Sequence, residues 1–126
     1  MLKTIAMLDN HGEEKEVIFE ANAGTPIRLK HTFGRDFWKI FGNTETIDEN
    51  LVFENLDVIS EIAFIMHCQG KHADMNALTF DDYVNWLETL DGMAILDHAL
   101  DILRLYITQD RRNSKPKKAA AQPPAK

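Results

Sequence analysis

The middle of the chain carries its most apolar helical pattern, Ile59-Ser60-Glu61-Ile62-Ala63-Phe64-Ile65-Met66. Apolar residues recur there at helical spacing on one stripe, and a second stripe lies beside the first. The first stripe holds Val52, Leu56, Ile59, Ala63 and Met66, and the second holds Val58, Ile62 and Ile65. So wide an apolar arc predicts one long helix at the centre of the domain, capped by Asp48 and ending near Gly70.

Upstream of this helix the sequence alternates between apolar and polar residues as β-strands do. Residues 2–8 and 15–21 flank a turn-rich segment, residues 9–13, and together they predict a hairpin. The alternation returns over residues 27–33, which predicts a third strand. Its core-facing positions would be Ile27, Leu29, His31 and Phe33. We therefore expect a three-stranded antiparallel sheet with one solvated face.

Two shorter helices are expected on either side of the long one. The first would begin at an N-cap, Thr32, and end at Gly42, a residue suited to the left-handed conformation that often follows a helix. Its buried stripe would be Phe33, Phe37 and Phe41. The second would follow Thr79 and Asp82, which have the spacing of a capping box. Its inward stripe would be Phe80, Val84 and Leu87, flanked by Tyr83 and Leu90.

A last helix is expected after Asp91, and it carries two apolar stripes. The first is a seam that one neighbour can cover: Met93, Leu96, Leu100, Leu103 and Ile107. The second consists of Ile95, Ala99, Ile102 and Tyr106. Two stripes on one helix leave two interpretations open, deep burial within the domain or contact with a second molecule. Under the second interpretation, the second stripe and the off-stripe Trp38 form a candidate interface.

The sequence thus predicts an α+β fold, with about three strands followed by a bundle of about four helices over residues 1–110. The formal net charge of −6 is unevenly divided. All 20 acidic residues and eight of the 14 basic ones lie in residues 1–110, while the other six basic residues lie in residues 111–126. We expect that basic, Pro/Ala/Lys-rich segment to be a disordered tail. The acidic body argues against nucleic acid as a partner, because it repels phosphate groups. The sequence contains no stretch of about 20 apolar residues, so we expect no membrane-spanning helix.

The residues that could support catalysis are poorly placed for it. Cys68 is the only cysteine, and its histidine neighbours His67 and His72 are too few for a tetrahedral metal site. A catalytic thiol would also need an oriented base, so a buried, inert Cys68 is the better interpretation. The carboxylate pairs Asp48-Glu49 and Asp81-Asp82 fall in the first turns of expected helices, where the helix dipole favours negative charge. We expect neither an enzyme nor a metal or other cofactor.

The order of these elements resembles the tail assembly chaperones of long-tailed phages that infect Gram-positive bacteria. That family has an F-G-[KR]-D motif at the start of a helix, then a long helix and an F-x-x-W-L segment. The matching residues here are Phe33, Gly34, Arg35 and Asp36, followed by Trp86 and Leu87. The resemblance covers roughly residues 1–110, and its matching residues mark the fold rather than a binding role.

The resemblance implies a non-enzymatic protein of the host cell cytoplasm that is absent from the finished virion. Such chaperones coat the tape measure protein, keep it soluble and help to recruit tail tube subunits, which implies self-association. Many also exist in a longer form made by ribosomal frameshifting, and the segment Asn113–Ala121 would suit a linker to such an extension.

Two other interpretations start from the residues rather than from the resemblance. The acidic body could belong to a small adaptor or inhibitor that binds a basic protein, with tight one-to-one binding that depends steeply on salt. A Cys/His metalloenzyme would require bound zinc, which the shortage of ligands argues against.

Overall fold

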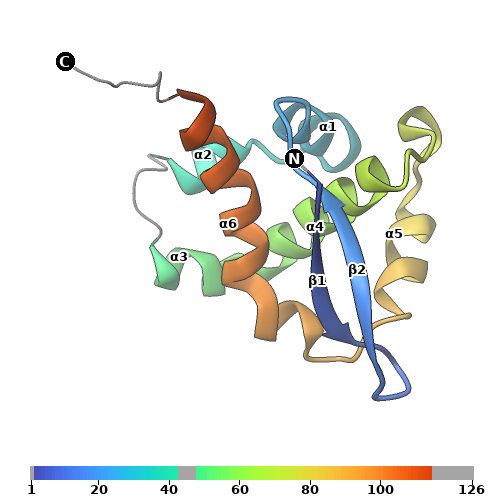
Figure 1. Cartoon of the computed structure of the whole chain (residues 1–126). Coiled ribbons are helices and arrows are strands. Elements are labelled where there is room, and N and C mark those ends of the chain that lie inside the picture. The colour runs from blue at the N-terminus through green and yellow to red at the C-terminus, as the bar shows by residue number, and fades with distance from the viewer. Residues whose placement is uncertain (1, 43–47, 115–126) are drawn as a thin grey trace.

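A computed structural model describes residues 2–42 and 48–114 of the chain, with residues 108–114 as backbone only. It has the expected α+β organisation, in which an N-terminal antiparallel hairpin is followed by helices (Figure 1). The hairpin lies on one side of the central helix, and the last helix lies alongside both. The numbers of strands and helices differ from those expected.

The predicted hairpin is confirmed. Strand β1 (Leu2–Leu8) pairs with β2 (Glu14–Glu20) in a register that sets Leu2 opposite Glu20 and Leu8 opposite Glu14. The turn is held by Asp9, whose Oδ1 accepts hydrogen bonds from the backbone N–H of His11 at 2.8 Å and of Glu13 at 3.0 Å. In this turn Gly12 adopts a φ of 80°, which a residue without a Cβ reaches at no steric cost.

The predicted third strand is wrong, because residues 25–33 form a helix, α1 (Thr25–Phe33). Pro26 sits in its first turn, where the fixed φ of proline suits a helix start, and Gly34 ends it in the left-handed conformation at φ 72°. Leu29 and Phe33, which are four residues apart, share the inner face of this helix, with Leu29 fully buried and Phe33 half-buried. Ile27 and His31, expected to face the core, are exposed.

The short helix after it begins later than expected. Helix α2 (Phe37–Phe41) is capped by Asp36, whose carboxylate accepts from the Lys39 backbone N–H at 3.2 Å, and not by Thr32. Thr32 is itself inside α1. The stripe of three phenylalanines is therefore divided between two helices. Phe37 and Phe41 are buried.

The long central helix is confirmed, but it is interrupted near its start. Asp48 caps a short helix, α3 (Glu49–Glu54), and Asn55 separates this from α4 (Leu56–Gly70). At Asn55 the backbone leaves the helical region, with φ −128° and ψ 41°, and the side-chain amide donates to the Leu51 carbonyl at 2.9 Å. Every residue from Val58 to Met66 is buried, so α4 is the centre of the core.

The remaining helices follow a 3₁₀ turn, η1 (Met75–Ala77). Helix α5 (Phe80–Leu87) begins with the predicted capping box, in which Thr79 and Asp82 exchange hydrogen bonds at 3.0 and 3.1 Å. Its inner face is rotated from the one expected: Tyr83 is buried, whereas Phe80, the first residue of the helix, is 69% exposed. At that position the side chain has no packed turn before it to lie on.

Helix α6 (Ala94–Ser114) packs against α4 and α3. Its backbone continues past residue 110, where we expected the compact domain to end. The expected polar loop over residues 43–46 and the expected tail from Lys115 onward lie outside the described residues. Among the described residues, the helices are too short or too polar to cross a membrane.

Candidate binding site

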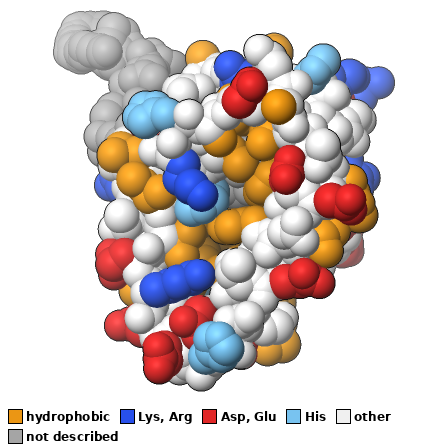
Figure 2. Space-filling view, turned by 90° about the vertical axis from the view of Figure 1, so that its right-hand side faces the viewer, with side chains coloured by type: hydrophobic (Ala, Val, Ile, Leu, Met, Phe, Trp, Pro, Cys, Tyr) orange, Lys and Arg blue, Asp and Glu red, His pale blue; other side chains and the backbone are white. Residues whose placement is uncertain are grey.

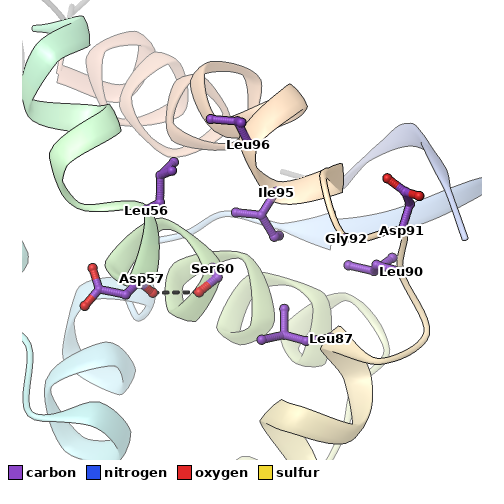
Figure 3. Close-up of a pocket in the computed structure, with 9 residues that line it drawn as sticks. All are labelled: Leu56, Asp57, Ser60, Leu87, Leu90, Asp91, Gly92, Ile95 and Leu96. Atoms are coloured by element: carbon purple, nitrogen blue, oxygen red, sulfur yellow. Dashed lines mark hydrogen bonds between the residues drawn. The ribbon is translucent and has the colours of Figure 1, made fainter. Parts of the chain in front are cut away.

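An open apolar groove lies where the start of α4, the end of α5 and the start of α6 meet (Figure 3). Its volume is about 420 Å³. The apolar lining comes from Leu56, Leu87, Leu90, Ile95 and Leu96, and the polar lining from Asp57, Ser60, Asp91 and Gly92. Helices from three separate parts of the sequence therefore build one apolar hollow at the surface.

The turn between α5 and α6 fixes one end of this groove. The Asp91 N–H donates to the Leu8 carbonyl at 3.0 Å, and the Asp91 carboxylate accepts from the Met93 N–H at 3.0 Å. The first contact ties the turn to the end of β1, and the second starts α6 close to the position expected from Asp91. Met93 is 52% exposed and Leu96 is 37% exposed. The beginning of α6 thus presents apolar side chains to solvent beside the groove.

The second apolar stripe of α6 was the candidate interface, and the first was expected to be covered by a neighbouring helix. The structure buries most of the second stripe and leaves the beginning of the first exposed. Ala99, Ile102 and Tyr106 are buried in the core of the chain itself, so the prediction that they form an interface is wrong. Ile95 is half-buried and lines the groove. The stripe expected to be covered by a neighbour is buried only in its later part, at Leu103 and Ile107. Its first residues, Met93 and Leu96, are the exposed ones.

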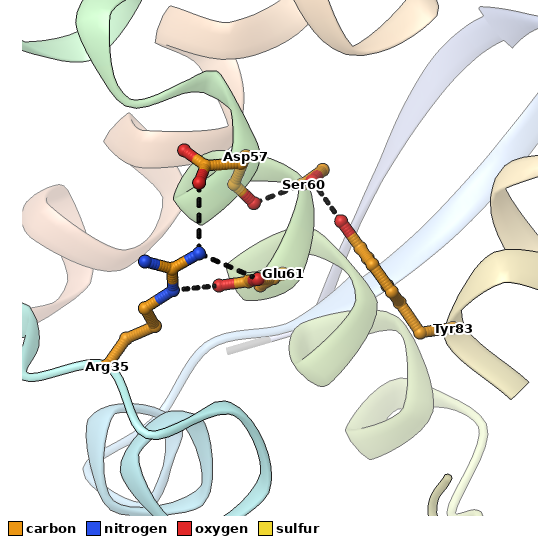
Figure 4. A network of polar contacts seen from close by, with 5 residues as sticks. All are labelled: Arg35, Asp57, Ser60, Glu61 and Tyr83. Atoms are coloured by element: carbon orange, nitrogen blue, oxygen red, sulfur yellow. Dashed lines mark hydrogen bonds and ion pairs between the residues drawn. The ribbon is translucent and has the colours of Figure 1, made fainter. Parts of the chain in front are cut away.

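A polar network joins Arg35 to the first turns of α4, which also line the groove (Figure 4). Arg35 Nε donates to Glu61 at 2.9 Å, and its Nη2 reaches both Asp57 at 2.9 Å and Glu61 at 3.3 Å. The hydrogen bond with Glu61 is the main cause that raises the pKa of Arg35 above that of a free arginine. Asp57 also lines the groove, so this network fixes the chain leading into α2 against the first turns of α4.

Ser60 connects this region to α5. Its hydroxyl donates to the Asp57 carbonyl at 2.7 Å and shares a buried hydrogen bond with the hydroxyl of Tyr83. Burial raises the pKa of Tyr83, so its hydroxyl stays protonated at neutral pH. The sequence alone does not predict this contact, because Ser60 and Tyr83 are 23 positions apart and leave no local pattern.

The six residues of the family resemblance make structural contacts in several parts of the fold. Phe33 meets Tyr83 and Phe64 edge to face, with ring centroids 5.0 and 6.3 Å apart, and Trp86 belongs to the same cluster. Gly34 ends α1, Arg35 pairs with α4 and Asp36 caps α2. Leu87 lines the groove. Each residue of the motif thus has a structural role.

Trp86 also fills the space between α5 and the hairpin. It stacks on His67 with ring centroids 5.1 Å apart and meets Phe19 of β2 edge-on at 6.5 Å. On the side of the molecule where β2 and α5 lie, hydrophobic side chains form a band between charged ones (Figure 2). Trp86 is therefore a packing residue rather than a free aromatic. Trp38 is 45% exposed and lies against Phe37 and Tyr106.

Cys68, the residue considered as a nucleophile, lies near the end of α4. Cys68 is buried, as expected, and burial raises its pKa to about 11, so at neutral pH it is a thiol and a poor nucleophile. Across the part of the chain that the structure describes, His, Cys, Asp and Glu side chains do not gather in threes that could hold a metal ion.

His67 gives a prediction on pH. Burial is the main cause that lowers its pKa below the usual 6.5, so it is neutral when folded and donates through Nδ1 to the Ile18 carbonyl at 2.8 Å. Once the pH falls below 6.5, the unfolded chain takes up this proton more readily than the folded chain, which destabilises the fold. We expect the free energy of unfolding to fall between pH 7 and pH 5, and to fall less in His67→Gln.

The measurement is urea denaturation at each pH, followed by circular dichroism. Asp9 does not titrate between pH 7 and pH 5, because its pKa is lowered from 3.8, mainly by the hydrogen bond from the Glu13 backbone. An equal pH dependence in both proteins would contradict the assignment.

Comparison with known protein families, with curated proteins and with solved structures finds no match to this chain.

Proposed function

We propose that this chain is a phage tail assembly chaperone that binds apolar helical segments of the tape measure protein in the groove between α4, α5 and α6. The observation that carries the proposal is an open groove lined by five leucine and isoleucine side chains, with Met93 exposed beside it. Amphipathic helices bind such grooves by placing residues at positions i, i+3 or i+4 and i+7 into them. The resemblance at Phe33–Asp36 and Trp86-Leu87 supplies the identity of the partner.

The rest of the proposal follows from the same role. The chaperone works in the host cell cytoplasm, keeps a long and apolar rod soluble, and recruits tail tube subunits to it. The acidic body favours solubility of the complex, since residues 1–110 hold all 20 acidic residues. A longer, frameshifted form would carry its extension after the segment Asn113–Ala121, most of which lies beyond the described residues.

Leu96 offers the test, since it lines the groove and is 37% exposed. In Leu96→Glu a bound helix would have to bury a carboxylate without a partner. We expect the fold to be kept and the affinity for the tape measure protein of the same phage to fall by at least about tenfold. Co-expression of both proteins, followed by co-purification and titration of the purified complex, measures this.

Ile27→Glu is the matched control, because Ile27 is 70% exposed on α1 and does not line this groove. Equal losses in both variants, or none in either, would contradict binding in the groove. The salt dependence of the affinity distinguishes the chaperone from the adaptor interpretation. Apolar binding by a chaperone changes little with salt, whereas binding of a basic partner by an acidic adaptor weakens steeply as salt is added.

A further inference from the structure

The helices that build the groove carry almost no positive charge. Residues 48–103 include α3, α4, α5 and the first half of α6, and they contain 12 aspartate and glutamate residues but a single lysine, Lys71, and no arginine. Lys71 follows the last residue of α4, whereas the groove is lined by the first turns of that helix. The apolar groove therefore lies in an acidic part of the molecule.

Arg35 brings a positive charge to the start of α4, but that charge is already shared. Its guanidinium pairs with Asp57 and with Glu61 at 2.9 Å each, so two carboxylates compete for one cation and a negative charge remains. Figure 3 shows the apolar lining of the groove between Asp57 and Asp91. Acidic side chains thus stand at both ends of the apolar surface.

Three carboxylates at the α5–α6 end of the groove have no cation to pair with. Asp91 lines the groove, Glu88 directly follows Leu87 of the lining, and Asp97 directly follows Leu96. Within residues 2–42 and 48–114, none of the three makes an ion pair. Glu88 and Asp97 are exposed and Asp91 is half-buried. These three side chains, the rim carboxylates, are therefore available to a positively charged partner.

We propose that the groove selects apolar helices whose apolar face is flanked by lysine or arginine. The inference rests on the proposed function and adds to it the charge of the segment that the groove holds. A helix in the groove places side chains at i, i+3 or i+4 and i+7 into it, so the residues beside that stripe reach the rim. Lysine and arginine suit these positions, because their aliphatic stems cover apolar surface while their charged ends stay in water near the rim carboxylates.

The same charges argue against other occupants of the groove. A second copy docked groove to groove would bring its own rim carboxylates against those of the first, and like charges placed opposite each other repel. Surfaces that bind anionic lipid carry lysine and arginine beside their apolar residues, whereas the residues beside this groove are acidic. A helix with acidic flanks meets the same repulsion. A helix with basic flanks is the occupant that neutralises the rim.

The test uses the purified full chain and two synthetic helical peptides that share one apolar face, with leucine at i, i+3, i+4 and i+7. One peptide carries lysine at the flanking positions and the other carries glutamate. Fluorescence anisotropy of the labelled peptides measures each Kd. We expect the lysine-flanked peptide to bind at least about tenfold more tightly than the glutamate-flanked one.

Two double variants locate the charge effect. Asp91→Asn with Asp97→Asn removes two rim charges, and asparagine keeps the side-chain oxygen that accepts from the Met93 N–H at 3.0 Å. We expect this variant to bind the lysine-flanked peptide about fivefold more weakly. Glu16→Gln with Asp81→Asn removes the same charge from exposed positions outside the groove and should change the affinity by less than about twofold.

The failure of this inference can be distinguished from the failure of the proposed function. Equal affinity for the two peptides, equal losses in the two double variants, or no binding of the lysine-flanked peptide overturns the inference. If both peptides bind equally and Leu96→Glu weakens both, the groove remains a docking site without charge selectivity, and the proposed function stands. If the lysine-flanked peptide binds as expected but the tape measure protein does not co-purify, the selectivity stands and that partner is rejected.

Salt gives a second measurement on the same complex. It screens the flanking charges and leaves the apolar contact, so the affinity for the lysine-flanked peptide should fall only about fivefold at high salt. An adaptor held mainly by charge would lose far more. An affinity for the lysine-flanked peptide that vanishes at high salt would overturn its placement in the apolar groove.

Discussion

Replacing Ile102 with glutamate is expected to unfold the domain. Ile102 is 0% exposed and lies in the main core cluster with Ile59 and Ile62 of α4. The substitution would place a carboxylate there without a partner, at a cost of about 5 kcal/mol or more. Small domains have a total stability of about 5–15 kcal/mol, so little folded protein should remain.

Circular dichroism and urea denaturation measure this effect. The matched control is Leu96→Glu, which makes a similar change on the exposed part of the same helix and should stay folded. A folded Ile102→Glu monomer that has lost an association of the wild type would contradict this assignment. It would restore the stripe of Ile95, Ala99, Ile102 and Tyr106 as an interface.

Replacing Arg35 with alanine is expected to destabilise the fold by about 2 kcal/mol. The side chain of Glu61 is only 10% exposed, and the variant would leave its carboxylate without the guanidinium. The Arg35 side chain is 36% exposed, so solvent replaces part of the lost interaction and the loss is smaller than for a fully buried pair. Arg35→Lys should recover less than half of it, because one ammonium group cannot reproduce a fork that contacts both Glu61 and Asp57.

Lys30→Ala is the control for Arg35→Ala. Lys30 and Asp36 form a pair at 3.9 Å with side chains 64% and 37% exposed, and its removal should change stability by less than about 0.5 kcal/mol. Urea denaturation at neutral pH compares the variants. Equal losses for Arg35→Ala and Lys30→Ala would show that the Arg35 network adds no more stability than an exposed ion pair.

The sequence predicted the elements whose signal is local and strong. The hairpin follows from alternation around a turn, the capping box from Thr79 and Asp82, and the burial of α4 from apolar residues on every side of it. These features depend on residues within one turn or one strand of each other, so a pattern in the sequence determines them.

The errors came from patterns that fit two structures. Residues 27–33 were predicted to be a strand because Ile27, Leu29, His31 and Phe33 occupy every second position. Leu29 and Phe33 are also four residues apart, which is the spacing of one face of a helix. Pro26 before them and Gly34 after them are helix boundary signals that favoured the second solution. The break at Asn55 had no comparable signal, because apolar spacing continues across it.

The candidate site was predicted least well. The sequence identified two apolar stripes on α6 but could not determine which of them the domain covers, since that depends on where α4 begins and α5 ends relative to the start of α6. Leu56, Leu87 and Leu96 come from three helices, and their meeting in one groove is a property of the tertiary structure.

The most direct test of the proposed function is a photo-cross-linking residue placed at Leu96 of the full chain in phage-infected cells, with the products identified by mass spectrometry. We expect cross-links to apolar helical segments along the tape measure protein, and none from the same residue placed at Ile27. Cross-links from Leu96 to one small basic protein alone, or equal products from both positions, would contradict a groove that holds the tape measure protein.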